Sequence, residues 1–266
     1  NLGDLSPRAL RVLSSVDLIA AEDTRNTASM LTAFGVRTRM MALHDHNESD
    51  VAGGLIARLA EGASVALVSD AGTPLISDPG YRLVSAVRTA GLPVVAVPGP
   101  CALIAGLSVS GLPTDAFSFI GFPPAKGAAR RKWLQTYAAW PHTLVLYEAS
   151  HRVAMLGEEL PQLFGAERPV CVLRELTKRF EQAWSGPAAE LSGWLSADAN
   201  RLRGEFVVVI GPGAEATDDE DVDRVLRPLL RALEPSRAAR VAAEILGLGK
   251  NALYQRALTL AGKRED

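Results

Sequence analysis

The stretch that decides the fold is Val65 to Tyr81, which reads V-A-L-V-S-D-A-G-T-P-L-I-S-D-P-G-Y. Its first four residues form an apolar run, a pattern that predicts a strand buried on both faces of a parallel sheet. From Ser69 to Gly80 the chain carries two aspartates, two glycines and two prolines, too many chain breakers for a regular element. Because ligands of open α/β sheets bind beyond the carboxyl ends of the strands, we expect a cofactor at this loop. A plain turn whose aspartates cap a helix is the alternative.

A second apolar run with a glycine turn follows shortly after. Pro93 to Val97 predicts another strand, which leads into the turn Pro98 to Cys101 and an alanine- and glycine-rich helix that ends before Gly111. A strand, a turn and a helix in this order present free backbone N–H groups at the helix start, which suits a polar ligand. Because the chain has neither G-x-G-x-x-G nor a phosphate-loop lysine motif, we expect a nucleoside-like ligand without a pyrophosphate.

Ionisable residues follow an earlier predicted strand, Asp17 to Ala21. This strand delivers Glu22, Asp23, Thr24 and Arg25 at its carboxyl end, where a sheet of this class binds its ligands. The simpler interpretation is that Asp23 or Thr24 caps the next helix. Both interpretations place these side chains at the same edge of the sheet as the loop after Val68.

Two histidines, His44 and His46, follow the predicted strand Arg39 to Leu43. No third ligand stands at metal spacing, so substrate contact or helix capping is favoured over metal binding, and no metal site is predicted. Cys101 and Cys171 show no pairing pattern, which suits a reduced, cytoplasmic protein.

Composition narrows the class of protein. Of 266 residues, 48% are hydrophobic, and 28 basic against 30 acidic side chains leave a net charge of -2, which gives no global sign of a polyanionic partner. The uncharged stretch from Thr89 to Thr114 is long enough to span a membrane, but its prolines and glycines divide it into shorter elements, so we expect no membrane span. The chain begins at Asn1 without a methionine, and we expect the natural N-terminus to lie upstream.

The order of elements predicts an α/β protein with two domains and a helical tail. Strands and helices alternate up to Gly111, which is typical of a parallel sheet. In the second half, strands that follow one another directly imply antiparallel pairs and a mixed sheet. The strands predicted there are Phe117 to Gly121, Thr143 to Tyr147, Val170 to Leu173, Phe180 to Ser185 and Glu205 to Ile210. The predicted domains are residues 1–113 and 114–213, followed by an acidic linker at 214–221 and a helix-turn-helix-like domain of three short helices at 222–266.

Basic residues gather in two places. Between Pro123 and Lys132 stand four cations and no acid, a pattern that suits phosphate contacts and also a plain solvated face. From Val222 to Asp266, nine Lys or Arg outnumber five acids, which favours RNA binding, with a small dimerisation or docking bundle as the alternative. The candidate RNA contacts are Lys126, Arg130, Arg131, Lys132, Lys250, Asn251, Tyr254 and Arg256.

Several strings, taken together, resemble one family closely. They follow in order along essentially the whole chain, tail included, so that chance similarity is negligible. The strings are A-A-E-D-T-R (20–25), A-L-H-D-H-N-E (42–48), V-S-D-A-G-T-P-L-I-S-D-P-G-Y (68–81), V-P-G-P-C-A (97–102), Y-E-A-S-H-R (147–152), R-E-L-T-K (174–178), G-E (204–205) and K-N-A-L-Y (250–254). On these strings the chain resembles ribosomal RNA methyltransferases within the tetrapyrrole-methylase-like enzymes that use S-adenosylmethionine.

The resemblance implies two α/β domains with S-adenosylmethionine in the cleft between them, a homodimer, and 2'-O-methylation of a cytidine in the decoding region of 16S ribosomal RNA in the small ribosomal subunit. It also implies a first strand ending in a T-P-I-G loop immediately before Asn1, which this sequence lacks, so that one wall of the cofactor site is absent. Related tetrapyrrole enzymes carry G-D-P-x-x-Y where this chain has Gly72-Thr73-Pro74. The cofactor residues implied by that match are Asp70, Ala71, Gly72, Thr73, Pro74, Leu75, Ser77, Asp78, Pro98, Gly99, Pro100, Cys101 and Ala102, with Tyr147, Gly204 and Glu205 closing the site from the second domain.

Methyl transfer to a ribose hydroxyl needs that oxygen placed in line with the methyl group, and a base for its proton. From their position at the sheet edge, the carboxylate of Asp23 or Glu22 is the candidate base, and Arg25 is expected to hold a phosphate. His44 or His46 is the alternative base. C-methylation of a tetrapyrrole and a non-catalytic RNA-binding or assembly factor that binds S-adenosylmethionine stay open as alternatives. The basic tail favours the ribosomal substrate.

Overall fold

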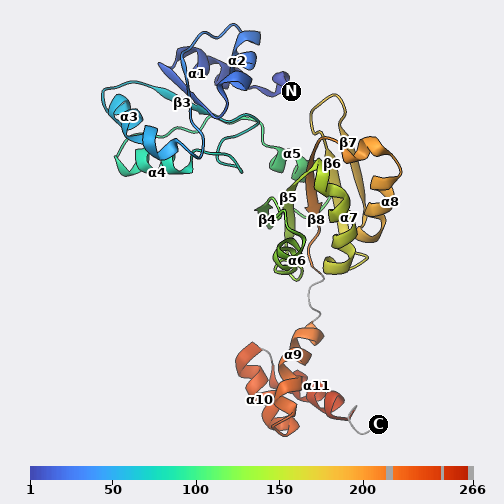
Figure 1. Ribbon diagram of the computed structural model, residues 1–266. Helices are drawn as coiled ribbons and strands as arrows, with labels where there is room; N and C mark the ends of the chain where they lie inside the picture. The colour runs from blue at the N-terminus through green and yellow to red at the C-terminus, as the bar shows by residue number, and fades with distance from the viewer. Residues whose placement is uncertain (214–217, 247–248, 263–266) are drawn as a thin grey trace.

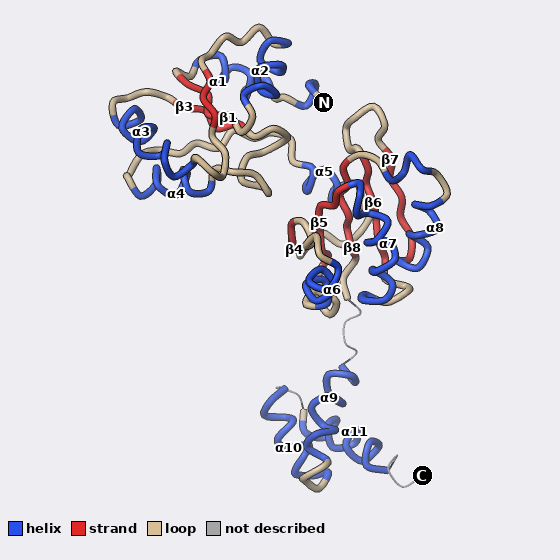
Figure 2. Tube along the Cα trace, viewed as in Figure 1, coloured by secondary structure: helices blue, strands red, loops and turns tan. Residues whose placement is uncertain are grey.

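The computed structural model describes residues 1–213, 218–246 and 249–262, without the side chains of 218–221, 252 and 262. It contains two α/β parts and a cluster of helices near the C-terminus (Figure 1). Figure 2 shows strands in the first two parts, whereas the described residues of the third are helical or loop. Among the described helices, none has the length and apolar character that crossing a bilayer requires.

The first part is a parallel sheet of three strands in the order β2-β1-β3, with helices on both faces. One face is covered by α1 and α2, where Leu13 and Leu31 pack against Ile19, and the other by α3 and α4. The elements are η1 (Leu2–Asp4), α1 (Pro7–Ser15), β1 (Leu18–Ala21), α2 (Thr24–Ala33), β2 (Met40–Ala42), α3 (Glu48–Ala60), β3 (Val65–Val68) and α4 (Tyr81–Thr89).

Two expectations about this sheet are wrong. Strand β3 is only half-buried along its length, because among the described residues it pairs with β1 alone and its other edge is open. The run from Pro93 to Val97 forms no strand, and Val95 is 72% exposed. An apolar run becomes a strand only where a neighbouring strand satisfies its backbone groups, and the described residues place no such neighbour beside it.

The second part is a five-stranded sheet in the order β4-β5-β8-β6-β7. The β4-β5 pair is parallel and the other pairs are antiparallel, so the predicted mixed sheet is confirmed. The predicted strand at Phe180 to Ser185 lies two residues further along the chain. The strands are β4 (Phe117–Gly121), β5 (Thr143–Ala149), β6 (Pro169–Arg174), β7 (Gln182–Pro187) and β8 (Glu205–Ile210).

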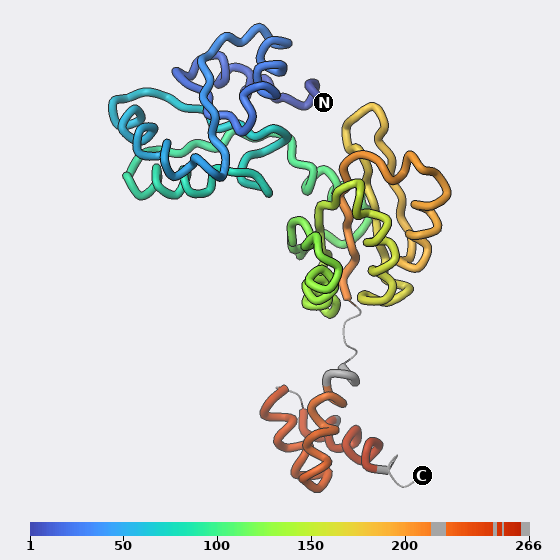
Figure 3. The backbone as a smooth tube through the Cα atoms, in the orientation of Figure 1, coloured from blue at the N-terminus to red at the C-terminus, as the bar shows by residue number. Residues whose placement is uncertain are grey.

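Helices cover both faces of this second sheet. Figure 3 follows the chain by colour from the first part, in blue and cyan, into the second part, in green to orange. The helices α6 (Gly127–Gln135), α7 (Ser150–Phe164) and α8 (Ala188–Ser196) share a core with one face, and η2 (Ala199–Leu202) follows α8. The other face packs against α5 (Ala102–Val109), although the sequence assigns α5 to the first domain. Gly106 makes this close approach possible, since a Cβ there would lie 2.8 Å from Val207 Cγ1. The chain therefore reaches the second sheet directly from the proline-glycine turn.

The third part contains α9 (Asp218–Leu230), α10 (Pro235–Leu246) and α11 (Lys250–Gly262), which share a small core built on Leu226, Ala239 and Leu253. Three helices match the predicted number. The turn predicted at Gly247 and Leu248, and the linker residues 214–217, lie outside the described residues. An ion pair of 2.7 Å between Arg256 Nε and Asp223 Oδ1 ties α11 to α9.

Candidate cofactor and catalytic site

The loop after β3 and the proline-glycine turn, which the family resemblance assigns to one cofactor site, lie in contact. Thr73 Oγ1 donates a hydrogen bond of 3.0 Å to the carbonyl oxygen of Pro100. Gly72 has a φ of +84°, and a Cβ there would lie 3.1 Å from the same oxygen. Because any larger residue would push the two loops apart, glycine is the residue that this contact requires. The two loops therefore form one cradle built largely from main chain.

The centre of the loop is strained and reaches the second sheet. Leu75 and Ser77 have φ of 73° and 68°, in a region that residues other than glycine rarely adopt. Between them, Ile76 packs against the cluster formed by α5 and the second sheet. The loop exit is fixed by the buried carboxylate of Glu48, which accepts a hydrogen bond of 2.7 Å from the Leu83 N–H in the first turn of α4. Such strain is typical of ligand-binding loops that their surroundings hold in place.

Tyr147 joins the cradle from the second sheet. Its hydroxyl oxygen accepts a hydrogen bond of 2.9 Å from the Leu103 N–H, at the start of α5. Burial, together with the nearby Cys101 and Asp78, raises the pKa of Tyr147 to about 12, so the phenol stays neutral. The structure thus brings this predicted second-domain residue to the proline-glycine turn.

Acidic side chains converge at the carboxyl ends of β1 and β3. Glu22 Oε2 accepts a hydrogen bond of 3.2 Å from the Asp70 N–H. Asp70 in turn accepts bonds from the Asp23 N–H (3.0 Å) and from the Asn26 side chain (2.8 Å). Asn26 was not predicted as a site residue, and its only sequence signal is its place one residue after Arg25. These bonds connect the two predicted polar segments into one acidic cluster.

Asp23 and Asp78 differ in their suitability as a base. Asp23 caps α2 and is paired with Arg25 at 2.6 Å, and these hydrogen bonds lower the pKa of its carboxyl to about 2. Burial, together with the charges of Glu22 and Asp70, raises the pKa of Asp78 to about 6. A carboxylate with a pKa near neutrality accepts a proton far better than one with a pKa near 2. The chemistry therefore favours Asp78, which the sequence nominates only as a cofactor contact.

The other predicted catalytic candidates lie at the periphery of this cluster. The Arg25 side chain is 89% exposed. Nε and Nη2 of its guanidinium pair with the Asp23 carboxylate at 3.1 and 2.6 Å, and the solvent-facing side of the guanidinium can still meet an anion. The His44 N–H donates a hydrogen bond to Asn47 Oδ1 (2.9 Å), and the His44 ring lies 6.0 Å from that of His46 in a T-shaped arrangement. These contacts place the histidine pair at the start of α3.

Gly204 and Glu205 contact the R-E-L-T-K loop. The Glu205 N–H donates a hydrogen bond of 2.9 Å to Glu175 Oε1, and Lys178 Nζ lies 3.0 Å from Glu175 Oε1 and 2.6 Å from Glu205 Oε2. Gly204, at a φ of +94°, leaves no room for a side chain, since a Cβ would lie 2.6 Å from Glu175. The predicted pair is therefore part of a rigid corner of the second sheet.

One predicted RNA contact is wrong. Arg130 is fully buried, with Nε 2.7 Å from Glu159 Oε2 and Nη1 2.9 Å from Glu148 Oε2, the latter an ion pair outside hydrogen-bond geometry. It lies one turn before the buried Leu134 on the inner face of α6, so it cannot touch a ligand in solvent. Its neighbours Lys126, Arg131 and Lys132 are exposed.

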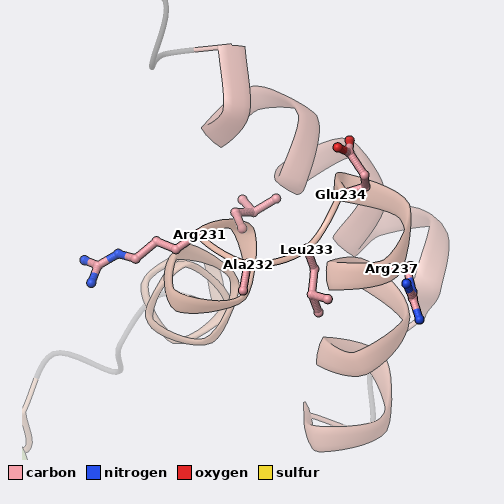
Figure 4. Close-up of a pocket in the computed structure, with 6 residues that line it drawn as sticks. Arg231, Ala232, Leu233, Glu234 and Arg237 are labelled. Atoms are coloured by element: carbon pink, nitrogen blue, oxygen red, sulfur yellow. The ribbon is translucent and has the colours of Figure 1, made fainter.

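In the helical tail, the predicted RNA contacts differ in their environment. Lys250 and Asn251 are exposed at the start of α11, Tyr254 is half-buried on the tail core, and Arg256 pairs with Asp223. A hollow of about 330 Å³ lies where α9 ends and α10 begins (Figure 4). The side chains of Arg231 and Arg237 extend away from each other there, so this hollow does not gather polar groups around a ligand.

The fold and the cradle define a class of enzyme. The pattern of the family described as Tetrapyrrole (Corrin/Porphyrin) Methylases matches residues 1–192, and the chain belongs to that family. The pattern described as RsmI C-terminal HTH domain matches residues 216–261.

Within that class, the chain falls in the family of ribosomal RNA small subunit methyltransferase I. It is 50% identical to the protein of that name from Pseudomonas aeruginosa, over 99% of this chain and 95% of the relative. The corresponding protein of Escherichia coli O157:H7 is 49% identical over 98% of this chain and 92% of the relative.

Solved structures share the fold at lower identity. Cobalt precorrin-4 methyltransferase, a cobalamin biosynthetic enzyme, matches with a TM-score of 0.58 and 16% identity, over 79% of this chain and 90% of that chain. Uroporphyrin-III C-methyltransferase from Thermus thermophilus, complexed with S-adenyl homocysteine, matches with a TM-score of 0.52 and 19% identity. The match covers 79% of this chain and 91% of that chain. At this identity the likeness supports the fold alone.

Proposed function

We propose that this methyltransferase transfers a methyl group from S-adenosylmethionine to the ribose 2'-hydroxyl of a cytidine in the decoding region of 16S ribosomal RNA. The observation that carries the proposal is the match to proteins named ribosomal RNA small subunit methyltransferase I, which are 49–50% identical over nearly the whole chain, tail included. The fold by itself is shared with enzymes that act on tetrapyrroles, so it cannot select the substrate.

The residues of the cradle fit S-adenosylmethionine. Gly72 lets the main chain of the two loops approach closely, and the carboxylates of Glu22, Asp70 and Asp78 suit a cationic sulfonium. When bound, the cofactor supplies a methyl group activated by the positive sulfur. Asp70 to Asp78 and Pro98 to Ala102 would hold it, with Tyr147 and the corner at Gly204 and Glu205 on the side of the second sheet.

The acidic cluster would remove the proton of the ribose hydroxyl. As the oxygen gains the methyl carbon, its proton passes to a carboxylate within hydrogen-bond reach, directly or through one water. Asp78 is the first candidate because its pKa lies near 6, and Glu22 and Asp23 follow. Arg25, exposed beyond its contact with Asp23, would hold a phosphate of the RNA.

The helical tail and the loop before α6 would hold the RNA. Lys126, Arg131 and Lys132 on the second part, and Lys250 and Asn251 on α11, are exposed cations and amides available to phosphates and bases. We retain the division into domains at residues 113 and 213, a homodimer, and a cytoplasmic location as parts of this proposal.

The test is to incubate the protein with labelled S-adenosylmethionine and, in parallel, with naked 16S RNA, small ribosomal subunits and uroporphyrinogen. We expect transfer to RNA or subunits, with the label on a ribose oxygen. Transfer to uroporphyrinogen alone would establish a tetrapyrrole enzyme. Cofactor binding without transfer to any acceptor would favour a binding or assembly factor.

Deleting residues 222–266 tests the role of the tail. We expect the affinity for S-adenosylmethionine to stay unchanged and the affinity for RNA to fall, because the deletion removes only the helices of the third part. An RNA affinity equal to that of the full chain would contradict the assignment of RNA binding to the tail.

A further inference from the structure

An aromatic side chain that the sequence did not nominate lies exposed beside the cradle. Phe122 follows β4 directly and is 50% exposed. Its ring packs against Tyr147 at 5.5 Å between centroids, in a T-shaped arrangement with an interplanar angle of 61°. Tyr147 packs in the same way against Phe119 at 4.8 Å. One side of Phe122 is therefore held by protein while about half of its surface meets solvent.

The segment that carries Phe122 is anchored on the buried charge cluster. Arg152 Nη1 donates a hydrogen bond of 3.3 Å to the carbonyl oxygen of Pro123, the next residue along the chain. Arg152 Nε lies 2.9 Å from Glu148 Oε1, and Glu148 is itself buried against Arg130. The exposed ring is thus presented by a fixed backbone, which lowers the entropy lost when a ligand binds it.

Three exposed basic residues follow Phe122 within ten positions of the chain. Lys126 and Lys132 are exposed, and Arg131 is 56% exposed although its Nε lies 3.3 Å from Glu159 Oε1. An open aromatic face for bases beside cations for phosphates is the arrangement by which proteins bind unpaired nucleic acid strands. A nucleic acid would neutralise these exposed charges through its phosphates, whereas an apolar protein partner would not.

Tyr147 connects this exposed ring to the cofactor cradle. Tyr147 contacts Phe122 through its ring and receives the Leu103 N–H through its hydroxyl. A base stacked on Phe122 would therefore lie one tyrosine away from the start of α5.

We propose that Phe122 is a stacking platform for an unpaired base in the RNA segment that carries the target ribose, with Lys126, Arg131 and Lys132 holding the adjoining phosphates. This assignment rests on the proposed function and adds to it the part of the second sheet that positions the strand. It predicts that the aromatic face, and not merely apolar volume, is required at residue 122.

The test compares Phe122→Leu, Phe122→Trp and a matched control, Phe180→Leu. Phe180 is 61% exposed and lies in the loop before β7, where Arg179 covers its ring at 5.4 Å, outside the proposed platform. The readouts are equilibrium binding of a short, fluorescently labelled single-stranded RNA of decoding-region sequence, the KM for RNA, the Kd for S-adenosylmethionine and the Tm.

We expect Phe122→Leu to weaken oligonucleotide binding and raise the KM for RNA by about tenfold, since stacking on one aromatic ring is worth about 1–3 kcal/mol per base. The Kd for S-adenosylmethionine and the Tm should not change. Phe122→Trp should bind as tightly as the wild type, with its indole fluorescence quenched by RNA, and Phe180→Leu should match the wild type in every readout.

RNA binding by Phe122→Leu that equals that of the wild type would overturn the proposal. A change in the oligomeric state of Phe122→Leu would also overturn it, because the ring would then belong to a contact between copies of the chain. A loss of affinity for S-adenosylmethionine would also overturn it, because Phe122 would then act by supporting Tyr147. If the wild type methylates no RNA, the proposed function fails, and the oligonucleotide measurement still decides whether residue 122 stacks on bases.

Discussion

The two α/β parts of the molecule differ in the length of their strands and in how deeply those strands are buried. The first sheet has three strands of three or four residues, and its strand β3 is half-buried throughout. The second sheet has five strands of five to seven residues, with β5, β6 and β8 buried along most of their length. The strained residues Leu75 and Ser77 belong to the first part, whereas the buried ion pairs of Arg130 belong to the second.

This difference separates two tasks. The first part supplies loops and ionisable groups whose conformation and pKa values are shifted, as a ligand site requires. The second part supplies a densely packed frame that fixes Tyr147 and one face of α5. Substitutions that act on one part at a time test this difference between the two parts.

The largest effect should come from the frame. Replacing Arg130 with Met leaves Glu148 and Glu159 with one cation fewer, and an uncompensated buried charge costs about 3–5 kcal/mol. We expect a corresponding fall in the free energy of unfolding, measured by denaturant titration. The exposed Arg131→Met is the control and should change stability by less than about 1 kcal/mol. Equal losses of unfolding free energy in the two variants would contradict a stabilising role for the buried ion pairs of Arg130.

In the cradle, Gly72→Ala should lower the free energy of unfolding less than the replacement of Arg130 does. It should weaken the binding of S-adenosylmethionine more. Alanine at a φ of +84° costs about 1–2 kcal/mol, and its Cβ would press on the Pro100 carbonyl. We expect a weaker Kd for S-adenosylmethionine by calorimetry, since the loops must separate. Gly53→Ala, in the middle of α3 with open space around it, should instead stabilise the protein slightly. Unchanged cofactor affinity in Gly72→Ala would show that the two loops do not act together.

Asp78→Asn should produce a pH-dependent effect of about 1 kcal/mol, since this side chain is only partly buried. The pKa of Asp78 is raised in the fold to about 6, so its contribution to stability is complete below pH 3.8 and is lost as the pH rises through 6. The variant should therefore melt at the same temperature as the wild type near pH 4 and at a higher temperature at pH 7. A constant difference in Tm across this range would contradict the raised pKa.

The same variant tests the base. If Asp78 takes the ribose proton, Asp78→Asn should slow single-turnover methylation by about 100-fold or more, while Asp23→Asn and Glu22→Gln change it less. If Asp78→Asn methylates RNA at the wild-type rate, the base is one of the other carboxylates, Asp23 or Glu22.

The smallest effect should come from Thr73→Val, which keeps the shape and removes one exposed hydrogen bond to Pro100. We expect a loss of about 0.5–1 kcal/mol in unfolding free energy and a modest rise in the Kd for S-adenosylmethionine. Thr89→Val, which removes a comparable bond within α4, is the control and should leave cofactor affinity unchanged.

Local sequence patterns were sufficient for much of the fold. Chain breakers after Val68 marked the cradle loop. The absence of a helix between two strands predicted the antiparallel pair of β6 and β7. These features depend on residues close together in the chain, so the local sequence carries the information.

Long-range contacts decided what the patterns could not. Arg130 and Arg131 are adjacent in one basic run. Arg130 is buried against Glu148 and Glu159, whereas about half of the Arg131 side chain is exposed to solvent. Pro93 to Val97 has the composition of a strand but no neighbour in the described chain to pair with. The pKa difference between Asp23 and Asp78 likewise follows from which groups the fold places around each carboxylate.

The sequence by itself predicted the two α/β parts and the helical tail, and its strings indicated the family. Helix propensity, chain breakers and hydrophobic periodicity act over a few residues and can be read in order. Only the tertiary structure decided that α5 packs on the second sheet, that Arg130 lies inside the frame, and that Phe122 stands exposed beside Tyr147. Burial and ion pairing are properties of residues brought together from distant positions, and no local pattern contains them.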